Sequence, residues 1–142
     1  MKVFLASYWE PENHGPGRKI GISPSKPKNL MDECGYDCEL CFNALSPGDL
    51  FWDYHKDKKL ADDDEELLKQ ASDKFLVGYK ELLNKYKETL ISEAKDSNYS
   101  IFDFIGLEEG DTLLSWEKEG HLTYRDITAE FLKDMGYEVE TR

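Results

Sequence analysis

The sequence has few basic residues and few cysteines. Its 142 residues include 18 Lys and Arg against 30 Asp and Glu, which gives a formal net charge of −12 at pH 7. This balance repels nucleic-acid backbones and anionic membrane surfaces, so direct binding to a nucleic-acid backbone is disfavoured. The chain has only three cysteines, and this odd number argues against a framework of structural disulfides.

Long hydrophobic runs are also missing. No apolar run approaches the ~18 residues that a membrane span needs, and the opening residues turn polar too soon for a signal peptide. We therefore expect a cytoplasmic protein that does not enter a membrane, with an oligomeric state that the sequence leaves unknown. With 39% hydrophobic and 13% aromatic residues, the chain can still bury a core. The absence of internal repeats and low-complexity linkers predicts one domain over residues 1–142.

Short apolar runs alternate with segments of helical spacing. The runs fall at 2–8, 19–23, 40–45, 112–116 and 137–139. Ser46 followed by Pro47 predicts a helix that ends at Tyr54 or His55. The acidic run 62–66 opens a helical insert that reaches about residue 96, and Gly78 inside it predicts either a break or a close contact.

The C-terminal segment, from residue 112 to residue 139, is the most informative about the topology of the sheet. Thr123 is the expected N-cap of a helix that stops at Gly136, between the strands predicted at 112–116 and 137–139. A strand, helix and strand in so short a span predict a parallel pair with a right-handed crossover. The expected fold class is thus a single-domain α/β protein with a mainly parallel sheet flanked by helices, in Rossmann-like layering.

Several short blocks resemble a known family. They are VFLASY at 3–8, IGISP at 20–24, LSP at 45–47, DTLLSWEK at 111–118, AEFL at 129–132 and GYEV at 136–139. The blocks resemble the uncharacterised proteins catalogued as domain of unknown function 488, which implies the same α/β fold. That family commonly has Cys at the end of the penultimate strand and Cys-His-Arg at the start of the following helix. Here Ser115 and Thr123-Tyr124-Arg125 stand at those places.

All three cysteines, Cys34, Cys38 and Cys41, fall within eight residues. Thiolates at this spacing can converge on Zn²⁺, with a fourth ligand from His14, His55 or Glu39. The spacing also resembles the iron–sulfur motif of radical S-adenosylmethionine enzymes, which have an aromatic residue where this chain has Leu40. Free thiols, or a redox pair of Cys38 and Cys41, are the alternatives to a zinc or Fe–S cofactor.

A second candidate site lies between the strand that ends at Ser115 and the helix that begins near Arg125. A helix N-terminus together with a guanidinium suits a phosphate or a carboxylate. The candidate ligand-binding residues are Ser7, Tyr8, Arg18, Ser23, Ser115, Trp116 and Arg125, and the candidate acid–base residues are Glu117 and His121. Each of them also has an ordinary structural role open to it, such as an ion pair between Arg125 and Asp126 or Glu130.

Three functions follow from these patterns. The first is the binding of a small anionic ligand, a nucleotide or a phosphate ester, at the strand ends near Arg125. The second is a three-cysteine metal protein, and the third is a non-catalytic acidic module that engages a basic partner. The residues leave open whether the protein is an enzyme, and they do not specify a substrate.

Overall fold

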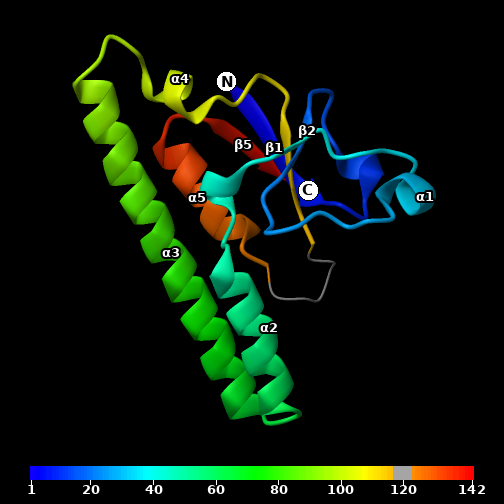
Figure 1. Cartoon of the computed structure of the whole chain (residues 1–142). Helices are drawn as coiled ribbons and strands as arrows, with labels where there is room; N and C mark the ends of the chain where they lie inside the picture. Colours follow the sequence, from blue (N-terminus) through cyan, green and yellow to red (C-terminus); the bar gives the residue numbers. More distant parts are fainter. Residues whose placement is uncertain (117–122) are drawn as a thin grey trace.

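The computed structural model describes residues 1–116 and 123–142 and is organised around a five-stranded, all-parallel sheet (Figure 1). The strand order is β3-β2-β4-β1-β5. The strands are β1 (Lys2–Ser7), β2 (Lys19–Gly21), β3 (Leu40–Cys41), β4 (Thr112–Ser115) and β5 (Glu138–Thr141). This arrangement confirms the predicted α/β class and the parallel pairing of the C-terminal unit.

Helices and loops cover both faces of the sheet. The helices are α1 (Leu30–Cys34), α2 (Asp49–Ala61), α3 (Glu65–Lys95), α4 (Ile101–Ile105) and α5 (Arg125–Asp134), with 3₁₀ turns at Pro11–Asn13 and Asn43–Leu45. The larger core joins alternate residues of β1 and β4 to apolar side chains of α3 and α5. A smaller core on the other face joins β1 and β4 to α1 and the segment that follows it. Burial on both faces explains why the central strands are apolar throughout.

The central strands β1 and β4 align so that Leu5 pairs with Leu113 and Ser7 with Ser115. Because side chains alternate along a strand, Leu113 and Ser115 project from the same face of the sheet. Leu113 lies in the larger core with Leu132 of α5. The two serines therefore end their strands on the face that α5 covers.

The long helical insert forms one continuous helix, α3, as the acidic run and the apolar spacing predict. Asp64 caps it, since its Oδ1 accepts hydrogen bonds from the N–H groups of Glu66 (3.0 Å) and Leu67 (3.1 Å). Gly78 does not break the helix. A Cβ at that position would lie 3.0 Å from Cδ2 of Leu50, so the glycine marks a close contact between α3 and α2.

The preceding helix differs from its prediction. It begins at Asp49 and continues to Ala61, whereas Pro47 and His55 were the expected limits. Gly48 has a positive φ of 58°, so the chain turns there before it enters the helix. Packing on α3 then extends α2 beyond what its mostly polar last turns indicate.

Two further boundaries are corrected. The apolar run 40–45 forms only the two-residue strand β3, because a 3₁₀ turn follows at Asn43–Leu45. The N-cap of α5 is Tyr124 rather than Thr123. The Thr123 hydroxyl nevertheless accepts the Arg125 N–H at 3.1 Å, so it still pairs one donor of the first turn.

Candidate functional site

The carboxyl edge of the sheet carries two buried serines. Ser7 and Ser115 are neighbours across β1 and β4, and neither is accessible to solvent. The Ser7 hydroxyl accepts a hydrogen bond from the Trp9 N–H at 3.2 Å. The Oγ of Ser115 has no hydrogen-bond partner in the part of the chain that the structure describes. A buried hydroxyl without a partner is uncommon and costs free energy, so Ser115 is the feature of this edge that needs an explanation.

Arg125 begins α5 at the same edge. Its Nε donates to the Thr123 hydroxyl at 3.1 Å, and its Nη1 donates to the Arg142 carbonyl at 3.2 Å. The Arg142 N–H in turn donates to the Leu5 carbonyl at 2.8 Å, two residues before the end of β1. These contacts hold the half-buried guanidinium beside the carboxyl ends of β1 and β5.

Buried hydroxyls fix the start of α5 in place. The Tyr124 hydroxyl donates to the Ile22 carbonyl at 2.8 Å, just after β2. One turn further along α5, the Thr128 hydroxyl lies 2.8 Å from the Tyr79 hydroxyl of α3. The N-terminus of α5 is therefore held against both the sheet and the long helix, which is a rigid setting for the partial positive charge of a helix start.

Tyr8, Ser23 and Trp116 come together on the other face of the sheet. The Tyr8 and Ser23 hydroxyls are 3.0 Å apart, and Ser23 donates to the Ser25 carbonyl at 2.7 Å. Because Ser23 uses its single proton there, Tyr8 is the donor between the two hydroxyls. The Trp116 indole N–H donates to the same Ser25 carbonyl. Burial raises the pKa of Tyr8 well above its usual range, so it remains a neutral donor.

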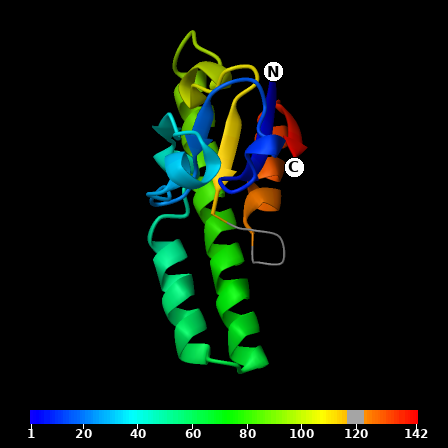
Figure 2. The same cartoon turned by 90° about the vertical axis from the view of Figure 1, so that its right-hand side faces the viewer.

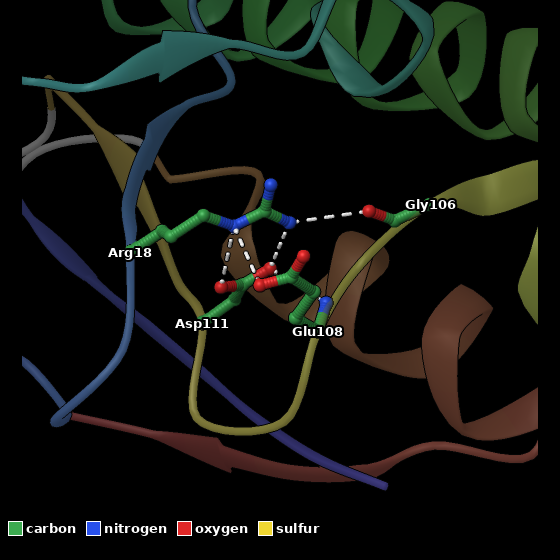
Figure 3. Close-up of polar contacts among 4 residues, drawn as sticks. All are labelled: Arg18, Gly106, Glu108 and Asp111. Carbon is green, nitrogen blue, oxygen red and sulfur yellow. Dashed lines mark hydrogen bonds and ion pairs between the residues drawn. The ribbon is translucent and has the colours of Figure 1, made fainter.

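Arg18 does not lie at this edge and instead faces Asp111 (Figure 3). It precedes β2, and its Nη2 contacts Asp111, which precedes β4, at 2.8 Å. Its Nε bonds the second oxygen of Asp111 at 3.1 Å, and Nη2 also donates to the Gly106 carbonyl at 3.1 Å. The residues before parallel strands lie at the amino edge, so Arg18 is separated from Ser7, Ser115 and Arg125 by the length of the sheet.

The three cysteines occupy different settings. Cys34 ends α1 half-buried, Cys38 is buried, and Cys41 is exposed on β3. The Cys38 thiol donates to the Leu40 carbonyl at 3.0 Å, and burial raises its pKa. Within residues 1–116 and 123–142, no three His, Cys, Asp or Glu side chains are grouped as metal ligands would be. The described geometry thus does not support a preformed three-thiolate zinc or iron–sulfur site.

The three alternatives for a fourth metal ligand lie on different segments: His14 follows the 3₁₀ turn at Pro11–Asn13, Glu39 precedes β3, and His55 is in α2. His55 is on α2 and packs edge-on against Phe51, with ring centroids 4.5 Å apart. His14 packs edge-on against Tyr36, at 5.0 Å between centroids, and its Nε2 lies 2.9 Å from the Ser7 carbonyl oxygen. Because a carbonyl only accepts, Nε2 carries the proton.

Some of the predicted residues lie outside the described part of the chain, and some of the observed contacts were not predicted. Glu117 and His121, the candidate acid–base residues, belong to residues 117–122 and are outside the described residues. The contact of His14 with the Ser7 carbonyl and the contact of Thr123 with Arg125 were not predicted. The first contact depends on how the loop after β1 folds back on the sheet edge. The second is local to the start of α5, where the sequence predicts Thr123 as a cap for the backbone but not as a partner of the Arg125 side chain.

Comparisons with protein-family models, with curated proteins and with solved structures find no match for the chain. The resemblance to domain of unknown function 488 therefore remains a prediction. Among the described residues, no helix is long and apolar enough to cross a membrane.

Proposed function

We propose that the protein binds a small anionic ligand, a nucleotide or another phosphate ester, at the carboxyl edge of the sheet between Ser7, Ser115 and the start of α5. Ligands of open parallel α/β sheets bind outside the carboxyl ends of the strands. The chain has an overall charge of −12, so a site for an anion needs local positive charge. Arg125 and the N-terminus of α5 supply it.

The observation that carries the proposal is the Ser115 hydroxyl. It is fully buried at the end of a central strand, on the face that α5 covers, and it lacks a hydrogen-bond partner among the described residues. A phosphate oxygen accepts hydrogen bonds, so it would satisfy the hydroxyl that the described residues leave unpaired. Ser7, directly across from Ser115, is the second hydroxyl that the same ligand would meet.

Arg125 supplies charge with directional hydrogen bonds. Two of its donors are engaged by Thr123 and by the Arg142 carbonyl, which orients the guanidinium plane. A guanidinium has five N–H donors, so this orientation leaves others for an anion. We propose ligand binding without a reaction, and we propose that it takes place in the cytoplasm. The described residues add no observation that favours a metal protein or an acidic interaction module over it.

Calorimetric titration with inorganic phosphate and with adenosine monophosphate tests the proposal. We expect at least one to bind, and we expect Ser115→Ala and Arg125→Ala each to weaken binding by about tenfold or more, as loss of a charge-assisted contact does. Lys133→Ala is the matched control, because Lys133 is in the last turn of the same helix and should leave binding unchanged.

Thermal unfolding provides a second readout. A ligand at 100 times its Kd stabilises a protein by about 2.7 kcal/mol, so saturating ligand should raise the Tm of the wild type and of Lys133→Ala. If phosphate and nucleotides neither release heat nor raise the Tm, or if both site variants bind as well as the control, the proposal fails.

A further inference from the structure

Two of the three tryptophans in the sequence lie at the carboxyl edge of the sheet. Trp116 comes directly after β4, and Trp9 comes shortly after β1. The Trp9 N–H donates to the Ser7 hydroxyl at 3.2 Å, which ties this residue to one of the two serines of the proposed anion site. Figures 1 and 2 show the end of β4 and the beginning of α5 at the same end of the sheet, away from the N-terminus. Both indoles are therefore at the edge where we propose that the anion binds.

Contacts from neighbouring strand ends hold the two indoles in place. The rings of Trp9 and Trp116 pack edge to face, with centroids 5.9 Å apart and planes at 64°. The Trp116 ring also meets the Tyr8 ring edge-on, at 6.1 Å between centroids. Its indole N–H donates to the Ser25 carbonyl in the loop after β2. These contacts fix the orientation of the Trp116 ring, so it is preorganised before any ligand binds.

The two indoles differ from the core aromatics in their exposure. Tyr8, Tyr79 and Tyr124 are at most 1% exposed, whereas Trp9 and Trp116 are half-buried. Trp116 packs against both hydrophobic cores, which lie on opposite faces of the sheet. It therefore lies over the strand ends, where the two faces meet. Half-buried aromatic rings at a ligand-binding edge form a surface on which another planar ring can stack.

We infer that the ligand of this edge is a nucleotide whose base packs against Trp9 and Trp116, rather than an aliphatic phosphate ester. This inference rests on the proposed anion site, where Ser7, Ser115 and Arg125 receive the phosphate. Ser115 and Trp116 are consecutive, so their Cα atoms are about 3.8 Å apart, and one nucleotide can reach both residues. Because side chains alternate along a strand, the phosphate lies toward α5 and the base lies toward the opposite face.

Stacking also suits the charge of the chain. The net charge of −12 opposes the approach of a phosphate, whereas the contact of a base with an indole is not opposed by that charge. The base therefore adds affinity that the phosphate group alone does not supply. Stacking tolerates different bases, since every base has a π-face, so we expect both a purine and a pyrimidine nucleotide to bind.

Calorimetric titration of the full chain with four compounds tests the inference. The compounds are inorganic phosphate, ribose 5-phosphate, adenosine monophosphate and cytidine monophosphate. Ribose 5-phosphate is the matched ligand, because it has the sugar and the phosphate of a nucleotide and lacks the base. We expect each nucleotide to bind about tenfold or more tightly than ribose 5-phosphate, as the loss or gain of one stacked base does.

Variants of Trp9 assign this difference to the indole. Trp9→Leu should remove the advantage of the nucleotides and leave the affinity for inorganic phosphate unchanged, whereas Trp9→Phe should retain most of the advantage. Tyr99→Leu is the matched control, since Tyr99 is 66% exposed between α3 and α4, before β4 begins, and the variant should bind all four compounds like the wild type. Circular dichroism checks that the variants are folded.

The outcomes separate this inference from the proposed function. If none of the four compounds binds, the anion site is wrong, and the nucleotide is wrong with it. If phosphate and ribose 5-phosphate bind and the nucleotides bind no more tightly, the anion site stands and the stacked base is refuted. Equal weakening of all four compounds by Trp9→Leu would likewise refute stacking, because the loss would then be structural. The comparison of the four compounds on the wild type needs no variant, so it decides the matter even if Trp9→Leu does not fold.

Discussion

Replacing Arg18 by alanine removes the cation that faces the Asp111 carboxylate at the amino edge of the sheet (Figure 3). The Asp111 side chain is 1% exposed, so the substitution leaves a nearly buried carboxylate without its counter-charge. It also removes both hydrogen bonds from the guanidinium to that carboxylate, at 2.8 and 3.1 Å. The hydrogen bond from the Glu108 N–H at 2.8 Å remains.

The expected loss in the free energy of unfolding follows from these contacts. Breaking a buried ion pair by removing one partner costs about 3–5 kcal/mol. Arg18 is 29% exposed, so water reaches its side of the pair and the loss should be at the lower end, about 3 kcal/mol. Arg18→Lys keeps the charge and loses the two-pronged geometry, so we expect a smaller loss, about 1–2 kcal/mol.

Urea unfolding monitored by circular dichroism measures the free energies of unfolding. The double variant Arg18→Ala with Asp111→Asn should be less destabilised than the sum of its single changes, because the uncompensated charge is then absent. If Arg18→Ala costs less than about 1 kcal/mol, the assignment of a structural ion pair is refuted. Phosphate or nucleotide binding should be unchanged in Arg18→Ala, since the residue lies at the opposite edge of the sheet from the proposed site.

Three other changes test separate parts of the fold. Burial lowers the pKa of His14 below 6.5, so the unfolded chain takes up a proton before the folded chain does as the pH falls, and the free energy of unfolding should decrease below pH 6.5. His14→Asn should reduce this dependence of the unfolding free energy on pH, as measured by unfolding titrations between pH 7.5 and pH 5. Tyr79→Phe removes the hydroxyl that donates to the Leu45 carbonyl at 2.7 Å and contacts Thr128, and should cost about 1–3 kcal/mol in urea unfolding. Asp64→Ala removes the N-cap of the long helix and should cost about 1 kcal/mol, whereas Asp64→Asn should cost little, and equal losses would contradict the capping role.

Local patterns with a direct physical cause were predictable from the sequence. The acidic run and the apolar spacing predict α3, because a carboxylate pairs the free N–H groups of a helix start and one apolar face packs on the sheet. The C-terminal strand, helix and strand predict a parallel pair, and the sheet confirms it. The sequence predicts that Ser7 and Ser115 each lie near the end of a strand. Only the register of β1 with β4 shows that the two serines are neighbours.

Other features depend on contacts that are distant in the sequence. The sequence makes Arg18 a candidate ligand-binding residue, yet its partner is Asp111, 93 residues away. The pairing of β2 with β4 brings the two residues together. The cysteines are close in sequence, but a helix end, a buried loop and an edge strand place their thiols in different surroundings. The length of α2 likewise depends on packing against α3 rather than on its own spacing.

We propose that a small anion binds at the carboxyl edge of the sheet. Titration of isotopically labelled protein with inorganic phosphate, followed through backbone amide NMR shifts, tests it residue by residue. We predict saturable shifts at Ser7, Ser115 and Arg125, with the amides of Arg18 and Asp111 unchanged. Shifts confined to the amino edge or to α2 and α3, or no saturable shift in the whole chain, would show that phosphate does not bind at the carboxyl edge.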